Sequence, residues 1–381
     1  MSDIYDSIGN AFVGTATPYY AEQGHFYLES NNVKDGQINH NSEIFINDEF
    51  YEKQKDKWLH TGDMVMVQSG HVGHAAVIPE ELDNTAAHAL IMFRNPKEEI
   101  EPYFLNYEYQ TDKAKKKIEN ITTGNTIKHI LASDMQEFVV DVPNYEEQKV
   151  IASYFRNIDH LITLHQRKCD EVKSLKKYML QKMFPQNEQK VPEIRFEGFT
   201  EAWEQRKLGD VFKEYSEKNH TELPALTIIQ GGGTVKREDS DRNLMYDKSN
   251  LSNYKMVRKD DFIVHLRSFE GGLEKSSSDG IISPAYHTFH GDVTDSRFYY
   301  PYFRSCEFIK HKLVPHVYGI RDGRSIDIDG MKTIEIPYTS IEEQRKIGDY
   351  LESIDDLITL HQQKCEELKK IKKFMLQKMF V

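Results

Sequence analysis

One long segment occurs twice in this chain, and the duplication limits the folds that the sequence can adopt. Residues 146–184 align without a gap to residues 342–380, at a constant offset of 196, with 25 identities in 39 positions. Both copies contain the run Leu-Ile-Thr-Leu-His-Gln, at Leu161–Gln166 and at Leu357–Gln362. The fold must therefore hold the same element twice, once in the middle of the chain and once near its end.

Each copy is predicted to form one long helix. Apolar residues recur three and four positions apart, which is typical of a coiled-coil or bundle face. A proline-containing turn and then Glu-Glu-Gln begin each copy, so acidic residues lie in the first helical turn, where the helix dipole favours them. A helix of 39 residues, about 58 Å long, needs a partner for its stripe. We expect the two copies to pair within one chain; pairing between two chains is the alternative.

A metal site between the two helices is conceivable. His165 and Cys169 are one turn apart, as are His361 and Cys365, and two antiparallel helices would bring them together as a Cys2His2 zinc site. Ligands four residues apart on rigid seam positions rarely converge on a tetrahedron. We therefore predict no metal site and interpret these residues as ordinary seam positions.

The segments ahead of the helices are predicted to be two domains of mixed strands and short helices. Each has an apolar strand after a turn, followed later by a polar glycine loop. The predicted class is α+β, with two similar mixed α/β domains and two long helices. The expected boundaries are 1–145 for the first domain, 146–184 for the first helix, 185–191 for a linker, 192–341 for the second domain and 342–380 for the second helix.

Charge alone does not decide whether the chain binds nucleic acid. The net charge is −12, and residues 1–145 hold 11 Lys/Arg against 23 Asp/Glu, whereas the remainder holds 38 of each. DNA binders usually offer basic surface to phosphates, but the position of the cations on the fold matters more than their number.

The three cysteines form no C-x-x-C pair, no apolar run could span a membrane, and the first residues lack a signal peptide. We expect a cytoplasmic protein with no membrane contact.

Motifs that would identify an enzyme are missing from the sequence. It contains no Walker loop, G-x-G-x-x-G, H-E-x-x-H or G-x-S-x-G. The N-P-P-[YF] tetrapeptide of amino-methyltransferases is also absent, and Asn95-Pro-Lys lacks its aromatic residue. A binding scaffold is therefore favoured over an enzyme.

Two variable domains, each followed by a Pro…Glu-Glu-Gln turn and a near-identical helix, resemble the specificity subunit of type I restriction–modification enzymes. Residues 191–210 look like the lead into a target-recognition domain of this family, and Lys182-Met-Phe-Pro185 looks like its helix ending. The resemblance covers essentially the whole chain. The first domain begins almost directly at Tyr5-Asp-Ser-Ile8 without such a lead, either because its start is naturally short or because the lead is lost.

The resemblance implies a non-catalytic subunit with a pseudo-twofold arrangement. Each domain would read one half of a split target in double-stranded DNA, and the antiparallel coiled-coil helices would set the gap between the halves. Two methyltransferase subunits, with S-adenosylmethionine, would dock on the helices, and restriction subunits that use ATP and Mg would join them; this chain itself would hold no cofactor. Two equivalent partners need two equivalent docking helices, which explains the duplication. The residues expected in the helix seam and in docking are Ile158, Leu161, His165, Val172, Met179, Ile354, Leu357, His361, Leu368 and Met375.

The candidate DNA-reading residues are chosen by chemistry. Arginine pairs with guanine through two hydrogen bonds, and Asn or Gln does so with adenine. A solvated loop residue or a surface ion pair is the alternative for each candidate. The Lys113–Lys117 cluster is expected near phosphates. The candidates are Gln68, Ser69, His71, Asn125 and Lys128 in the first domain, and Arg267, Ser268, Tyr318, Arg321 and Arg324 in the second.

Two other functions fit the same sequence. The acidic first domain would suit an anti-restriction protein that imitates DNA. A structural coiled-coil adaptor would bind a methyltransferase without reading DNA.

Overall fold

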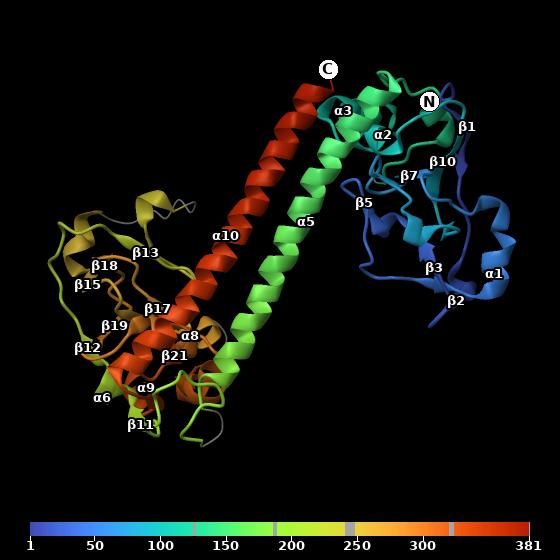
Figure 1. Cartoon of the computed structure of the whole chain (residues 1–381). Coiled ribbons are helices and arrows are strands. Elements are labelled where there is room, and N and C mark those ends of the chain that lie inside the picture. Colours follow the sequence, from blue (N-terminus) through green and yellow to red (C-terminus); the bar gives the residue numbers. More distant parts are fainter. Residues whose placement is uncertain (125–126, 186–188, 241–247, 320–323, 381) are drawn as a thin grey trace. The chain divides into compact units, whose positions relative to one another are not determined.

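The chain forms two compact units, and each is described by itself (Figure 1). The first unit is Met1–Gln166 with Gln362–Val381, and the second is Arg167–His361. Each unit therefore contains one mixed domain and parts of both long helices, which are α5 (Tyr145–Lys182) and α10 (Ile341–Met379). The computed structural model describes residues 1–124, 127–185, 189–240, 248–319 and 324–380.

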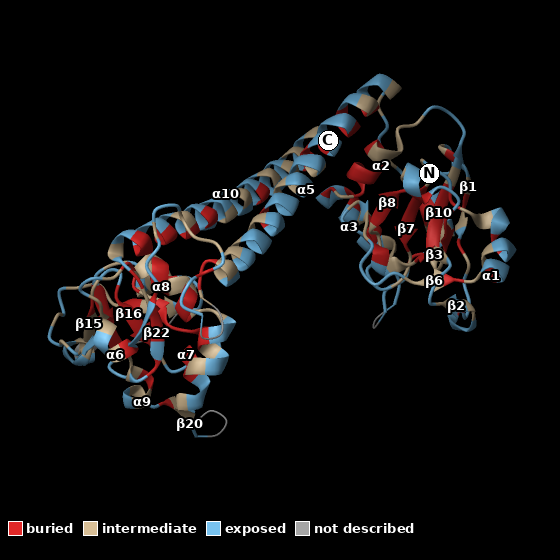
Figure 2. Cartoon of the chain, turned by 60° about the horizontal axis from the view of Figure 1, so that its bottom comes forward, coloured by how far each residue is buried: buried red, intermediate tan, exposed pale blue. Residues whose placement is uncertain are grey.

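A four-stranded antiparallel sheet forms the centre of the first domain, and its strand β7 is buried on both faces (Figure 2). Successive side chains of a strand point to opposite faces. Met64 and Met66 accordingly join the core that holds the helix ends, while Val65 and Val67 join a separate core. A strand covered on both faces is apolar throughout, which accounts for the sequence Met-Val-Met-Val. The strand order is β1 (Tyr5–Asn10), β10 (Leu90–Pro96), β7 (Met64–Val67) and β8 (Ala75–Val77).

Smaller elements complete the first domain. A second sheet has the order β2 (Tyr20–Ala21), β6 (Phe45–Ile46), β3 (His25–Leu28) and β9 (Ala86–Ala87), and β4 (Val33–Lys34) pairs with β5 (Gln37–Ile38). The short helices are α1 (Asp48–Lys53), α2 (Pro102–Glu108), α3 (Asp112–Ile121) and α4 (Ala132–Gln136).

The second domain repeats the central sheet of the first. Its order is β12 (Lys213–Tyr215), β19 (His287–His290), β16 (Phe262–Val264) and β17 (Glu274–Lys275). In both sheets the earliest strand pairs with the latest, and the two middle strands follow. The predictions of an α+β class and of two similar mixed domains are therefore confirmed.

Among the described residues, further strand pairs and short helices complete the second domain. The pairs are β13 (Leu226–Ile229) with β14 (Gly233–Lys236), β15 (Lys255–Val257) with β18 (Gly280–Ile282), β20 (Val317–Tyr318) with β21 (Ser325–Ile326), and β11 (Glu204–Lys207) with β22 (Glu335–Tyr338). The helices are α6 (Leu208–Val211), α7 (Ser268–Gly271), α8 (Ser296–Phe303) and α9 (Ile328–Lys332).

Within each unit the long helices contact each other and run antiparallel. In the first unit Asp159, early in α5, pairs with Lys372, late in α10, at 2.7 Å between Oδ1 and Nζ. In the second unit Asp355 pairs with Lys176 at 2.6 Å. Because Asp159 and Asp355 are separated by the repeat offset of 196, as are Lys176 and Lys372, the duplicated sequence makes the same contact twice.

The first long helix is shorter than predicted. It begins at Tyr145 and ends at Lys182, whereas the repeat suggested an end at Phe184. Met183 and Phe184 leave the helix because both side chains are buried in the core of the second domain.

A buried glutamine attaches each domain to its helix. Gln148 accepts a hydrogen bond from the backbone N–H of Glu101 at 3.0 Å, and it donates to the carbonyl of Pro143 at 2.8 Å. Gln344 accepts from Asp295 N–H at 3.0 Å and donates to the Thr339 carbonyl at 2.8 Å. Glu101 and Asp295 are the N-caps of α2 and α8. The repeated Glu-Glu-Gln turn is thus the joint between helix and domain.

Candidate nucleic-acid interface

Two polar turns of the first domain lie side by side. The first, residues 68–74, joins β7 to β8; the second is described at residues 122–124 and 127–130, and together we call them the first loop cluster. The Ile130 N–H donates to the Gln68 carbonyl at 2.9 Å, and the Gly70 N–H donates to the Lys128 carbonyl at 3.0 Å. Gly70 has a φ of 79°, in the left-handed region that glycine adopts without strain. The fold therefore brings Gln68, Ser69 and Lys128 together from distant parts of the sequence.

The residues of the first loop cluster differ in how exposed they are and in whether they carry charge. His71 and Lys128 are exposed, while Gln68 and Ser69 are half-buried. Lys128 contacts Glu119 at 3.3 Å, a surface ion pair whose energy is small, so the ammonium can exchange this partner for a phosphate. Asn125 lies outside the described residues.

The second domain places arginines around the short helix α7, and these residues with the β20–β21 hairpin form the second loop cluster. Arg267 is exposed and is the N-cap of α7. Arg324 lies at the hairpin, contacts Glu270 of α7 at 3.4 Å, and stacks over the Phe269 ring at 4.4 Å. Tyr318 of β20 is 61% exposed. Arg321 lies outside the described residues.

Ser268 does not fit its predicted role. The residue is fully buried, and its hydroxyl accepts a hydrogen bond from the backbone N–H of His265 at 2.9 Å. The serine closes the turn that begins α7, so its oxygen is not presented to a base edge. Ser268 follows the exposed Arg267 in the sequence, and only the difference in burial shows that the two residues have different roles.

A glycine loop near α7 was missed as part of this surface. The N–H groups of Gly231 and Gly233 donate to the buried carboxylate of Glu274 at 2.7 and 3.2 Å. A Cβ on Gly271 of α7 would lie 2.3 Å from the side-chain nitrogen of Gln230, so the exposed Gln230 touches the helix that carries Arg267. The sequence Gln-Gly-Gly-Gly after an apolar strand could have indicated this loop, because glutamine forms two hydrogen bonds with adenine.

A basic pocket of about 360 Å³ lies beside the first loop cluster. Lys115, His74 and Gly73 line it together with Lys369, Lys372 and Lys373 of α10. Burial lowers the pKa of His74, so this ring is neutral at pH 7 and the lysines supply the positive charge.

The expected phosphate-binding cluster of Lys113–Lys117 is divided by the fold. Lys113 pairs with Asp141 at 3.0 Å, and Lys117 donates to the Val139 carbonyl at 3.1 Å. These two lysines hold the domain together, whereas Lys115 faces the basic pocket.

The long helices carry an exposed apolar stripe in addition to the contacts between them. Ile158, Ile354, Cys169 and Cys365 are buried. Leu161 is 41% and Leu357 is 46% exposed, so these two residues, predicted for the seam or for docking, face away from the contact between the helices and stay candidates for docking. A step of three residues turns a helix by about 300°, so Leu161 faces about 60° away from Ile158. The other expected seam residues, His165, Val172, Met179, His361, Leu368 and Met375, are half-buried.

The exposed stripe repeats with the sequence. It consists of two matched sets separated by the offset of 196: Leu161, Leu164, Leu175 and Tyr178, and Leu357, Leu360, Ile371 and Phe374. Large exposed apolar patches commonly mark protein interaction sites. Both helices therefore offer the same candidate docking face.

Two properties of the described residues bear on metal and membrane binding. In the described part of the chain, no three His, Cys, Asp or Glu side chains are placed to hold a metal ion together. No helix among those same residues is long and apolar enough to cross a membrane.

The chain is similar to known proteins over most of its length. Residues 26–174 and 200–370 match the family described as type I restriction modification DNA specificity domain. The putative type I restriction enzyme MjaX specificity subunit of Methanocaldococcus jannaschii is 24% identical over 319 residues, which cover 80% of this chain and 73% of that protein. The MjaVIII specificity subunit of the same organism is 26% identical over 271 residues, covering 66% of this chain and 63% of its own length.

A solved structure shares the fold. The S subunit of a type I restriction–modification system from M. genitalium aligns with a TM-score of 0.60 and 15% identity, over 100% of this chain and 94% of that chain. Because the family match alone covers well over half of the sequence, the chain belongs to the family of type I restriction–modification DNA specificity subunits.

Proposed function

We propose that each domain of this subunit reads one half of a bipartite DNA target through its own loop cluster. The observation that carries the proposal is the contrast between a shared framework and different loops. Both domains have the same sheet order and the same glutamine joint to a helix. The first loop cluster offers Gln68, His71 and Lys128, whereas the second offers Arg267, Arg324 and Gln230. Different base-reading side chains on one framework suit two different half-sites.

Phosphate contacts would add affinity and orientation to this reading. Four lysines line the pocket beside the first loop cluster, and because Lys372 is paired with Asp159, the cations that it offers to phosphate are Lys115, Lys369 and Lys373. Asp35 and Asp112 also line it. Lysine binds phosphate as a point charge and carries no sequence information. The first domain is acidic overall, so this local concentration of cations supports DNA contact at one edge rather than over the whole surface.

The long helices would dock two methyltransferase subunits. The exposed stripe of one helix is repeated on the other, so two copies of one partner would meet equivalent surfaces. In this proposal the subunit is not itself catalytic. S-adenosylmethionine would be held by the methyltransferases, and ATP and Mg by restriction subunits bound to the same complex.

The proposal is tested by co-expressing the chain with the methyltransferase encoded beside it and mapping methylated adenines by long-read sequencing. We expect a split motif that disappears when this chain is omitted. Replacing the first loop cluster with that of a related subunit should change one half of the motif only. A complex that forms but methylates no split motif would favour the DNA-mimic or adaptor functions.

A further inference from the structure

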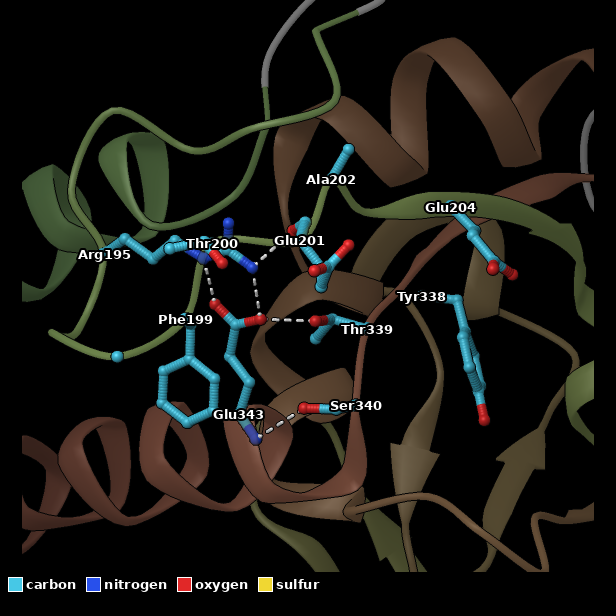
Figure 3. A pocket seen from close by; sticks show the side chains of 11 residues that line it. Arg195, Phe199, Thr200, Glu201, Ala202, Glu204, Tyr338, Thr339, Ser340 and Glu343 are labelled. Carbon is cyan, nitrogen blue, oxygen red and sulfur yellow. Dashed lines mark hydrogen bonds and ion pairs between the residues drawn. The ribbon is translucent and has the colours of Figure 1, made fainter.

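In the second unit, one glutamate at the start of α10 fixes the segment that precedes β11. Glu343 is buried, and its two oxygens accept hydrogen bonds from Arg195 Nε and Nη2 at 2.7 and 2.9 Å (Figure 3). The indole Nε1 of Trp203 donates to the same carboxylate at 3.0 Å, and the Thr339 hydroxyl also donates to it. The carboxylate therefore holds an arginine and a tryptophan of one segment.

Trp203 packs against two aromatic rings, Phe184 just after the end of α5 and Phe298 of α8. Its ring centroid lies 5.9 Å from that of Phe184 and 5.5 Å from that of Phe298. Strand β11 follows at once and pairs antiparallel with β22, from Glu204 opposite Tyr338 to Lys207 opposite Glu335. The segment is thus held by an ion pair, an aromatic pocket and a strand pairing.

The first unit contains the same receiving groups. Glu147 and Phe380 stand at the repeat offset of 196 from Glu343 and Phe184. Phe104 is the third residue of α2, as Phe298 is the third residue of α8. The rings of Phe104 and Phe380 lie 5.2 Å apart, close to the 4.9 Å between Phe184 and Phe298.

In the first unit these three groups line a cavity of about 520 Å³. In the second unit the corresponding groups surround Trp203. Glu147 is exposed, whereas Glu343 is buried. The equivalent groups therefore line a cavity in the first unit and pack around Trp203 in the second.

A buried acid in this cavity has an unused hydrogen-bonding atom. Glu108 is 8% exposed and lines the cavity, and its Oε2 has no hydrogen-bond partner among the described residues. Burial raises the pKa of Glu108 to about 7. Leaving a buried polar atom unpaired is costly, so a donor entering the cavity would remove this cost.

The segment that corresponds to β22 has no strand partner in the described part of the chain. Residues 139–142 align with Glu335–Tyr338 at the offset of 196 but form no strand. Val139 is 70% exposed. Lys117 donates to the Val139 carbonyl at 3.1 Å, and Lys312 donates to the equivalent Glu335 carbonyl at 2.7 Å. Since β22 pairs with β11 while keeping its lysine, Lys117 does not prevent strand pairing.

We propose that this cavity and residues 139–142 form a docking site for an extended peptide segment of a partner chain. The segment would pack a tryptophan against Phe104 and Phe380 and pair an arginine, eight residues earlier, with Glu147. Its following residues would add a β-strand to 139–142, a known mode of peptide recognition. The chemistry is that of residues 191–207 of this chain, which fill the equivalent site in the second unit. The site would act independently of DNA.

The first test measures binding of a fluorescent synthetic peptide of residues 191–207 to the full chain by anisotropy. We expect saturable binding of one peptide per chain. Peptides carrying Trp203→Ala or Arg195→Ala should bind at least ten times more weakly, because each removes one anchor without altering the protein. No binding at millimolar chain concentration, or equal binding of the Trp203→Ala peptide, would overturn the proposal.

Variants of the chain locate the site. Glu147→Lys should weaken peptide binding at least tenfold, because it replaces the acceptor with a cation. Glu146→Lys makes the same charge change one position earlier, outside the cavity lining, and should leave affinity within twofold. Equal losses from both variants would show that only net charge matters and would reject the site.

An intramolecular version gives an independent readout. Residues 191–207 fused directly ahead of Met1 would start at the right place, because Met1 N donates to the Phe138 carbonyl at 2.6 Å as Leu208 N does to the Ile334 carbonyl at 2.8 Å. The fused chain should have a higher Tm than the unfused chain and should no longer bind the free peptide. A fused chain that binds peptide as well as before would contradict the proposal.

Discussion

The repeated helices and the two loop clusters of this molecule have diverged to different extents. The helices share 25 of 39 residues, and they repeat the Asp–Lys contact, the glutamine joint and the exposed apolar stripe. The loop clusters occupy matching places in matching sheets, yet they carry different polar side chains. A surface that meets two copies of one partner is constrained to stay the same, while surfaces that read different half-sites must differ.

The largest expected effect comes from Glu343, which has the same residue type as its repeat equivalent Glu147 but is buried, whereas Glu147 is exposed. Glu343→Ala leaves Arg195 and the Trp203 indole without their shared acceptor, and breaking a buried pair in this way costs about 3–5 kcal/mol. Glu147→Ala, at the equivalent exposed position, should cost less than about 0.5 kcal/mol. Denaturant unfolding of both variants measures the difference. Equal losses would mean that burial at Glu343 contributes nothing.

The docking stripe predicts the next largest effect. Leu164→Asp and Leu360→Asp place a charge on the exposed stripe of one helix each, and loss of a central interface residue costs about 2 kcal/mol or more. Each single variant should release one of two methyltransferases, and the double variant should release both, as counted by native mass spectrometry.

Neighbouring residues provide the matched control for the stripe. Thr163→Asp and Thr359→Asp change exposed positions about 100° further round the same helices. Both should keep two methyltransferases. Loss of partners from these variants as well would indicate that charge anywhere on the helix disrupts assembly.

Base reading by the second loop cluster predicts a selective change. Arg324→Ala should relax one position in one half of the methylated motif, since a bidentate arginine–guanine contact contributes about 1–3 kcal/mol of discrimination. The other half should be unchanged. Arg206→Ala removes an exposed arginine that stacks on Tyr338 at 3.7 Å, away from the loop cluster, and serves as the control. An unaltered motif in both variants would leave Arg324 as a surface ion pair with Glu270.

The last prediction concerns pH and the first domain alone. Burial raises the pKa of Glu108 from 4.5 to about 7. The unfolded chain therefore releases this proton at lower pH than the folded chain, and stability falls as the pH rises from about 4.5 to about 7. Glu108→Gln removes the titration, so its stability relative to the natural chain should rise by about 3 kcal/mol between pH 4 and pH 8.

Thermal unfolding at several pH values measures this effect. Glu98→Gln, at an exposed position of the same domain, should leave the pH profile unchanged. A Glu108→Gln chain with the same pH profile as the natural chain would show that the carboxylate is hydrated in the cavity.

Several features of the fold were readable from sequence because they depend on local pattern. The helices follow from apolar periodicity over 39 residues, and the family follows from the same repeat. The sequence predicted Leu161 for the seam or for docking without separating the two, because a three-and-four spacing fits two adjacent stripes of a helix. Which stripe is buried depends on the rotation of the helix against its partner, and local sequence does not contain that rotation.

The candidate site shows the same division between local and distant information. Arg267 and Arg324 were selected by side-chain chemistry, but Ser268 was selected beside them although its hydroxyl is used inside the domain. The lysines of α10 that join Lys115 in the basic pocket come from more than 250 residues away in the chain. No spacing rule connects residues that only the closed fold brings together.

By itself the sequence determined that two long segments are helices, that the chain carries one framework twice, and to which family it belongs. All three depend on periodicity and on similarity along the chain, which need no knowledge of contacts. Only the tertiary structure decided that Glu343 is buried while Glu147 is exposed, and that Leu161 faces outward. The physical reason is that burial and hydrogen bonding depend on what packs against a residue, so identical sequence in the two copies meets different neighbours.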